Sequence, residues 1–253
     1  MKFPGAITSA RLDQSCPGAR PNEWAILLHG LCRSNRSMAP MAAALESAGY
    51  RVLNIQYPSR SASIDILSEG AIGPAVRDCC QNGAEKIHFV THSLGGILAR
   101  SFLSRHTLPQ PGRIIMLGPP NQGSEIVDKL GLWRLFKMIN GPAGTELGTG
   151  GDSTPNRLGP AHFCVGIIAG NRSINWINSL LIPGPNDGKV SVERTRLAGM
   201  ADHLVIPCAH PFLMRHPAAI RQTLLFLANG RFHHSQSRHF DPNPPTNHAT
   251  GSF

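Results

Sequence analysis

Residues 86–100, KIHFVTHSLGGILAR, place a serine, Ser93, between a strand-like apolar run and a helix-like run, with two glycines close behind it. A serine hydroxyl is a poor nucleophile at neutral pH, so it needs an exposed position and a base within hydrogen-bond reach. A sharp turn from strand to helix supplies the exposure, and the residues two before and two after the serine must then be small. Gly95 meets this condition, whereas Thr91 stands where glycine is usual. The stretch predicts a nucleophilic serine at a strand-to-helix turn.

Two backbone N–H groups are expected to face this serine. The first N–H groups of a helix have no acceptor within the helix, so the N–H of Leu94 is one predicted donor to an oxyanion. The run LLHGL at 27–31 ends an apolar stretch in a turn that can aim the N–H of Leu31 into the same cleft, and His29 is expected to orient that turn. A purely structural interpretation stays open on this stretch alone, in which the serine only caps a helix and the glycines pack against a strand.

A nucleophilic serine also needs a histidine base and a carboxylate, expected later in the chain with the acid first. Asp187 is the only carboxylate in the Pro-, Gly- and Asn-rich loop 183–191, and His210 directly follows an apolar run. Asp187 is therefore expected to orient His210, which would take the proton of Ser93. The less well placed competitors are Asp202, Glu193, His203, which precedes its strand, and His216, which opens a helix and is expected to cap or pack it.

Alternating strands and helices are predicted to position these residues. Short, continuously apolar runs predict strands at 24–30, 51–58, 86–92, 113–120, 162–170 and 203–209. Helical spacing predicts helices at 34–50, 64–84 with an irregularity at Gly73-Pro74, 94–106 and 216–230. Strands that are apolar throughout indicate a parallel sheet covered by helices on both faces. Such sheets bind ligands at the carboxyl ends of their strands, and the predicted serine, acid and histidine each follow a strand.

With these residues in hand, the chain resembles the α/β-hydrolase superfamily. Within it, the chain is similar to bacterial lipases and esterases related to GPI-inositol-deacylase-like proteins. The motifs that carry the resemblance are LLHGL, VTHSLGG, GPPNQGSE, GPNDGKVSVERTRL and HPFLMRHP, spread over residues 24 to about 232. Thr91 at its position also occurs among such lipases. The resemblance implies Ser93 as nucleophile, His210 as base, Asp187 as orienting acid, and Leu31 with Leu94 as oxyanion donors.

The activity implied by this resemblance is hydrolysis of carboxylic esters through an acyl-enzyme intermediate, without a cofactor. The expected substrate is a small-molecule or lipid acyl ester. The same side chains also suit an acyltransferase or a thioesterase, and a non-catalytic binding domain can keep the same fold. The complete order of Ser93, Asp187 and His210 argues against the binding domain, because a decayed site usually loses a member.

One compact α/β-hydrolase domain is expected over residues 22–232, with about six strands and without the extra N-terminal strands of larger members. Residues 1–21 are rich in Pro, Gly and Ser and predict an irregular arm, and residues 233–253 lack periodicity and predict a disordered tail. The segment 124–160 interrupts the alternation and predicts a lid or cap, with a core helix over the sheet as the alternative. The lid residues expected to contact substrate are Leu132, Trp133 and Phe136.

Composition bears on partners and location. The net charge is +9, but the arginines are scattered, so no nucleic-acid partner is expected and a peripheral contact with anionic membranes stays open. The six cysteines show no zinc spacing, and none of the 12 histidines forms an i, i+4 pair beside an acid, so no metal site is expected. No run has the length of a signal-peptide core or a membrane span, which favours a cytoplasmic location, and a monomer is expected.

Overall fold

The computed structural model describes residues 22–130, 134–174, 179 and 181–234. The expected arm at 1–21 and residues 235–253 of the expected tail lie outside the described residues. The packed part of the chain extends past the expected boundary, because the backbone of His233 exchanges hydrogen bonds of 2.8 and 2.7 Å with the Gln222 side chain. The packing of the described residues therefore includes His233.

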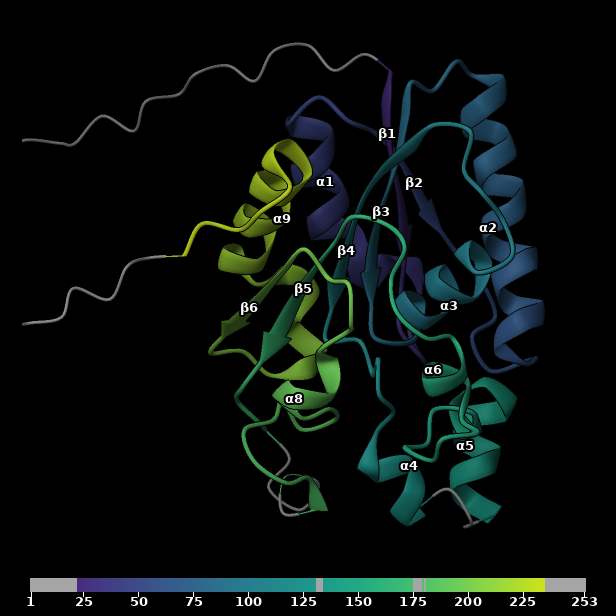
Figure 1. The fold of residues 1–253 in the computed structure, drawn as a ribbon, viewed down its shortest axis with the longest axis vertical. Helices are drawn as coiled ribbons and strands as arrows, with labels where there is room; N and C mark the ends of the chain where they lie inside the picture. Colours follow the sequence, from purple (N-terminus) through teal and green to yellow (C-terminus); the bar gives the residue numbers. More distant parts are fainter. Residues whose placement is uncertain (1–21, 131–133, 175–178, 180, 235–253) are drawn as a thin grey trace, which may run out of the picture.

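Six strands form one parallel sheet in the spatial order β2-β1-β3-β4-β5-β6 (Figure 1). The strands are β1 (Glu23–Leu28), β2 (Arg51–Ile55), β3 (Lys86–His92), β4 (Pro111–Leu117), β5 (Val165–Gly170) and β6 (Asp202–Ile206). Each one lies within a few residues of a predicted strand. The prediction of a parallel sheet with about six strands is confirmed.

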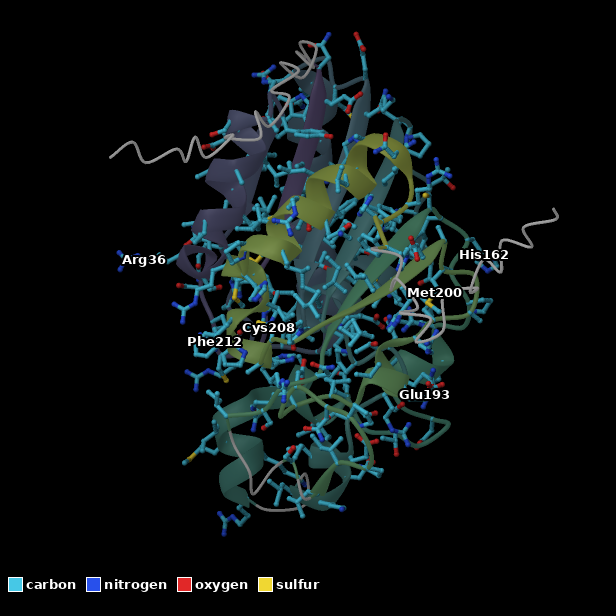
Figure 2. All side chains as sticks on the ribbon, turned by 90° about the vertical axis from the view of Figure 1, so that its left-hand side faces the viewer. Arg36, His162, Glu193, Met200, Cys208 and Phe212 are labelled. Atoms are coloured by element: carbon cyan, nitrogen blue, oxygen red, sulfur yellow. The ribbon has the colours of Figure 1, made fainter. Side chains whose placement is uncertain are left out.

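Helices cover both faces of this sheet, as predicted. The described helices are η1 (Asn35–Met38), α1 (Ala39–Ser47), α2 (Ile64–Gln81), α3 (Leu94–Leu103), α4 (Glu125–Leu130), α5 (Arg134–Thr145), α6 (Thr154–Arg157), α8 (Val192–Thr195), η2 (His210–Arg215) and α9 (Pro217–Asn229). Neighbouring residues of β1 divide between two cores, since Ile26 packs with α2 and α3 and Leu27 packs with α1 and α9. Figure 2 looks onto the second face, with α9 and α1 in front of the sheet. None of the helices in the described ranges is long and apolar enough to cross a membrane.

The helix α2 runs through Gly73-Pro74 without a break, where the sequence predicts an irregularity. A proline inside a helix removes one hydrogen bond and crowds the carbonyl group four residues before it. That residue is Gly70, and a Cβ atom built on it would meet no other atom within 4 Å. The helix also buries one whole side in the core that it shares with α3, and this packing outweighs the missing bond.

The segment between β4 and β5 carries α4, α5 and α6, which lie beyond the carboxyl ends of the strands (Figure 1). A parallel sheet binds its ligands at the carboxyl ends of its strands, and the segment 124–160, here called the cap, lies at this end. Among the cap residues expected to contact substrate, Leu132, Trp133 and the side chain of Phe136 lie outside the described part of the chain.

Backbone contacts anchor the cap to the loop after β2. Gly141 has a φ of 66° and comes so close to Arg60 that a Cβ atom on it would lie 2.1 Å from the Arg60 carbonyl oxygen. The N–H of Ala143 donates to the carbonyl of Ala62 at 3.2 Å. Both the left-handed conformation and the close approach require glycine at 141, which explains the kink in α5 at this residue.

Candidate active site

Ser93 forms the turn between β3 and α3, with a φ of 53° and a ψ of −120°. A positive φ is rare for a residue with a side chain, and such strain is concentrated at functional sites. Gly95 makes the turn sterically feasible, because a Cβ atom there would lie 2.6 Å from the Leu28 carbonyl oxygen. The larger Thr91 fits because its buried hydroxyl donates to the Ile115 carbonyl at 3.2 Å. The predicted strand-to-helix turn is therefore present at Ser93.

His210 and Asp187 form a buried pair beside this turn. Nδ1 of His210 lies 2.7 Å from Oδ2 of Asp187, and the N–H of His210 donates to the Asp187 carbonyl at 3.0 Å. The other carboxylate oxygen, Oδ1, accepts from the N–H groups of Lys189 at 3.0 Å and Val190 at 2.9 Å. These bonds satisfy a carboxylate whose residue is only 1% exposed. They also hold the His210 ring so that its other nitrogen, Nε2, is the one directed away from the acid.

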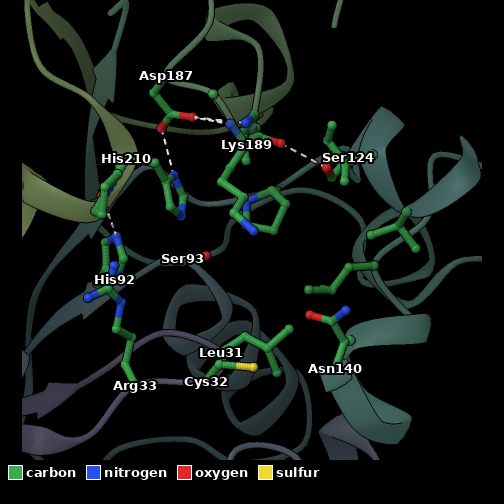
Figure 3. A pocket seen from close by; sticks show the side chains of 18 of the residues that line it. Leu31, Cys32, Arg33, His92, Ser93, Ser124, Asn140, Asp187, Lys189 and His210 are labelled. Atoms are coloured by element: carbon green, nitrogen blue, oxygen red, sulfur yellow. Dashed lines mark hydrogen bonds and ion pairs between the residues drawn. The ribbon is translucent and has the colours of Figure 1, made fainter. Parts of the chain in front are cut away.

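Ser93, Asp187, His210 and Leu31 line one pocket of about 590 Å³. Figure 3 shows the His210 ring between the Asp187 carboxylate and Ser93. Among the contacts of the described residues, the Ser93 hydroxyl forms no hydrogen bond with His210, and bonds of this kind often tighten only when substrate binds. The structure thus brings together residues that the sequence predicts as nucleophile, base, acid and N–H donor.

The two predicted N–H donors flank the serine. Leu94 is the first residue of α3, and Leu31 lies in the turn that follows β1. In the described part of the chain neither N–H group has an acceptor, so both remain available to an oxyanion. The turn comes close to the nucleophile, because a Cβ atom on Gly30 would lie 3.1 Å from Cβ of Ser93.

His29 orients this turn. Its ring stacks on Tyr57 with the centroids 4.1 Å apart, and its Nε2 accepts the Tyr57 N–H at 3.4 Å. On the other side of the ring, Nδ1 donates to the Gly30 carbonyl at 2.9 Å. Burial lowers the pKa of His29, which keeps the ring neutral and its Nε2 able to accept.

The cap supplies apolar walls to the pocket. Ile126, Val127 and Leu147 line it, together with Ile139, which is 46% exposed. An acyl chain is apolar along its whole length, so these walls can receive one. Within the described residues, no group of three or more His, Cys, Asp or Glu side chains could hold a metal ion.

Solved structures similar to this chain are named as lipases and esterases. A lipase from Bacillus licheniformis in its mature form is 21% identical with a TM-score of 0.62, over 83% of this chain and 92% of that one. A phospholipase from Legionella pneumophila in complex with thio-NAD is 18% identical with a TM-score of 0.63, over 82% of this chain and 58% of that one. A monoacylglycerol lipase from Paleococcus ferrophilus is 15% identical with a TM-score of 0.55, over 84% of this chain and 96% of that one. A scan against protein-family models and a search of curated proteins find no match.

These similarities agree with the six-stranded parallel sheet and its two helical layers. The chain has the α/β-hydrolase fold. At 15 to 21% identity, a structural match shows the fold alone. The relationship to GPI-inositol-deacylase-like proteins stays a prediction, because none of these structures bears on it.

Within this fold, His92 is a residue of the candidate site that sequence reasoning missed. Its Nε2 donates to the backbone carbonyl of His210 at 3.0 Å, and the two rings lie 4.8 Å apart. Complete burial, with the neighbouring His210 as a lesser cause, holds the pKa of His92 well below its usual value. His92 thus stays neutral and ties the loop that carries His210 to the end of β3. Its position directly before Ser93 is the one signal of this role in the sequence.

The segment PNQGS at 120–124 supports the loop that carries Asp187. Oγ of Ser124 donates to the Lys189 carbonyl at 2.8 Å, and Nδ2 of Asn121 donates to the Thr195 carbonyl at 2.8 Å. The loop after β4 therefore fixes the loop that precedes α8 beside the pocket. The side chains of Asn121 and Ser124 thus act on the backbone of a neighbouring loop.

The competing acids and histidines lie outside the pocket. His203 lies in β6, where it bonds a threonine hydroxyl at 2.9 Å, and burial lowers its pKa to about 4. His216 caps α9 by accepting a backbone N–H at 3.3 Å, as predicted. Asp202 accepts a backbone N–H at 2.7 Å, and Glu193 forms an ion pair at the surface. Each of these side chains therefore has a structural partner away from Ser93.

Two cations, Arg33 and Lys189, also line the pocket, and sequence reasoning missed both. Each is an exposed residue in a loop. A solvent-exposed cation in a loop has no distinctive sequence signal, because its neighbours in space come from other parts of the chain.

Proposed function

We propose that this protein is a serine hydrolase of the lipase and esterase type, which cleaves carboxylic esters. One observation carries the proposal: a single pocket holds the strained Ser93 beside His210, whose imidazole is bonded to Asp187 at 2.7 Å. A strained serine next to an oriented histidine is what nucleophilic catalysis requires and what a binding domain does not. The names of the similar structures, lipases and a carboxyl esterase, support the same reaction class.

In the proposed reaction, Ser93 Oγ attacks the acyl carbonyl while Nε2 of His210 accepts its proton. Asp187 keeps His210 in the tautomer with a proton on Nδ1 and stabilises the imidazolium. The N–H groups of Leu31 and Leu94 bind the oxyanion, and losing one such donor typically costs roughly 100- to 1000-fold in rate. His210 then protonates the leaving alcohol, and a water molecule, activated by the same histidine, releases the acid from Ser93.

The substrate class that fits the pocket is an acyl ester whose chain enters under the cap. The walls formed by Ile126, Val127 and Leu147 are apolar, and the pocket volume of about 590 Å³ is within the range of small-molecule sites. The acyl carbonyl would lie at Ser93, where the apolar walls and the N–H donors meet.

Hydrolysis of p-nitrophenyl esters of increasing chain length, by the wild type and by Ser93→Ala, tests the proposal. We expect the wild type to be active with an optimum chain length, and the variant to lose about a thousandfold or more of kcat/KM. Full activity in Ser93→Ala would overturn the proposal. Adding glycerol as an acceptor and analysing the products separates hydrolysis from acyl transfer.

Covalent labelling by a fluorophosphonate gives an independent test that does not depend on the choice of ester. The wild type is expected to react at one serine, and Ser93→Ala to lose the label. Ser47→Ala is the matched control, because Ser47 is exposed on α1 and bonds only a backbone carbonyl of its own helix, at 2.8 Å. A wild type that is folded and stays unlabelled would favour a non-catalytic binding domain.

A further inference from the structure

The pocket around Ser93 carries an excess of positive charge. Asp187 is the only carboxylate among the described residues that line it, and both oxygens of that carboxylate are bonded, to His210 and to two backbone N–H groups. Arg33 and Lys189 line the same pocket, and within the described residues their side-chain nitrogen atoms have no hydrogen bond or ion pair. In the view of Figure 3 the two cations lie on opposite sides of Ser93. Their positive potential is therefore available to a ligand.

A second hollow, of about 720 Å³, adjoins this pocket and shares Cys32 and Arg33 with it. Its other lining side chains are largely polar or cationic and include Gln56, Ser61 and Arg60, and the part of the chain that the structure describes adds no carboxylate to them. Two arginines thus face a hollow without a counter-charge, one of them at the boundary with the pocket that holds Ser93.

The cap holds Arg60 near the boundary between the two hollows. Nη1 of Arg60 donates to the carbonyl of Ile139 at 3.3 Å, and the thiol of Cys32 donates to the same carbonyl at 3.4 Å. Ile139 itself lines the first pocket, and the preceding residue, Met138, lines the second. This part of α5 therefore separates an apolar compartment from a cationic one.

An ester bound at Ser93 has two parts that leave the carbonyl in different directions. The acyl chain suits the walls formed by Ile126, Val127 and Leu147, which leaves the alcohol part toward Arg33. A guanidinium group pairs best with a planar or tetrahedral oxyanion, because its N–H groups can donate to two oxygens at once. A neutral alcohol part would leave Arg33 and Arg60 without an anionic partner.

We propose that the hollow bounded by Arg33 and Arg60 binds a phosphate or phosphodiester group on the alcohol part of the substrate, and that Lys189 adds to the positive potential at Ser93. The protein would then prefer acyl esters of glycerophosphate type to neutral glycerides. This proposal rests on the proposed esterase function.

Two substrates with the same acyl chain test the proposal: octanoyl glycerol, which is neutral, and octanoyl glycerophosphate. The measured quantity is the ratio of kcat/KM for the phosphate ester to kcat/KM for the neutral ester. The wild type is expected to favour the phosphate ester. The ratio is expected to fall about three- to tenfold in Arg33→Gln and in Arg60→Gln. Arg36→Gln is the matched control, because Arg36 is an exposed arginine near by that lines neither hollow and points away from the molecule (Figure 2).

Ionic strength gives a readout that needs no variant. The preference of the wild type for the phosphate ester is expected to shrink as NaCl rises to about 0.5 M, because salt screens exposed charges. Inorganic phosphate separates a free-anion site from a substrate subsite. If it inhibits neutral-ester hydrolysis by the wild type but not by Arg33→Gln, and the phosphate ester is not preferred, the proposal is overturned in favour of a free-anion site.

Failure of this proposal is distinguishable from failure of the esterase function. An active wild type whose ratio is near one and unchanged in Arg33→Gln overturns the phosphate subsite alone. A folded wild type that turns over neither ester and leaves Ser93 unlabelled by fluorophosphonate overturns the esterase function, and the subsite with it.

Discussion

Among single residues, Ser93 combines a strained backbone, which lowers the stability of the fold, with a hydroxyl that is exposed to the pocket. Its φ of 53° places a side chain in a backbone conformation that suits glycine. The surrounding packing holds this conformation, with Gly95 close against the Leu28 carbonyl and Thr91 fully buried. Strain of this kind typically costs about 1–3 kcal/mol. The strained turn exposes the hydroxyl to the pocket, where His210 can reach it.

Ser93→Gly is therefore expected to be more stable than Ser93→Ala. Glycine adopts the turn without strain, and this gain exceeds the extra freedom of glycine in the unfolded chain, for a net difference of about 1 kcal/mol in the free energy of unfolding. Urea unfolding of the two variants measures the difference. Both variants lack the hydroxyl, so the comparison isolates the effect of backbone strain at residue 93 on the free energy of unfolding. Equal stabilities would mean that the turn at Ser93 is not strained.

The sequence identifies the residues whose chemistry has a local pattern. Ser93 is marked by the glycines behind it, and Asp187 and His210 by loops that follow apolar strands. Arg33 and Lys189 carry no such pattern, because they meet only when the loops after β1 and β5 reach the same edge of the sheet. Sequence reasoning therefore predicts the proposed reaction centre, whereas the charge around it becomes visible only in the structure.

At the scale of elements, the strands were predictable because burial on both faces demands continuous apolar runs. The individual helices of the cap were not predictable, because they are short and are held by tertiary contacts such as Gly141 on Arg60 and Ala143 on Ala62. The helix α2 itself was predicted, but its continuity through Pro74 was not, because packing keeps it intact there. Helices and strands with a clear hydrophobic period can be predicted from the sequence. Features that depend on tertiary contacts cannot.

Arg100 on α3 is a buried tie between the sheet domain and the cap. It is 4% exposed, and its guanidinium donates to the carbonyl groups of Asn121 at 2.9 Å, Pro155 at 2.9 Å and Gly159 at 2.7 Å. Burial lowers the pKa of Arg100 to about 10, so the group stays charged at neutral pH. A planar fork of donors fits three carbonyl groups in a way that a single ammonium group does not.

Arg100→Lys is expected to destabilise the protein by about 1–3 kcal/mol, because buried carbonyl groups lose their donors. The cap should also open more readily, so proteolysis within residues 145–160 should speed up relative to the rest of the chain. Urea unfolding and limited proteolysis measure the two effects. Arg77→Lys on α2, an exposed site, is the control, and the idea fails if both variants behave like the wild type.

For the molecule as a whole, buried histidines link stability to pH. Burial is the main cause that lowers the pKa of His29, His88, His92 and His203, the last to about 4. Below about pH 6.5 the unfolded chain takes up protons at these histidines, while the folded chain does not until a lower pH. The unfolded state then binds more protons, so stability falls as the pH falls. Carboxylates such as Asp65, whose pKa is lowered mainly by a hydrogen bond from Arg105, add to this only at more acidic pH.

The free energy of unfolding is accordingly expected to drop by at least about 2 kcal/mol between pH 7 and pH 5, with each neutral histidine contributing up to roughly 1.4 kcal/mol per pH unit. Urea unfolding at the two pH values gives the drop. His203→Gln should reduce it, since glutamine can bond the same threonine hydroxyl without titrating. His162→Gln, at an exposed position, should leave it unchanged. A stability that stays constant from pH 7 to pH 5 would mean that the interior histidines accept protons without unfolding, and the neutral state assigned to His92 beside the reaction centre would then be wrong.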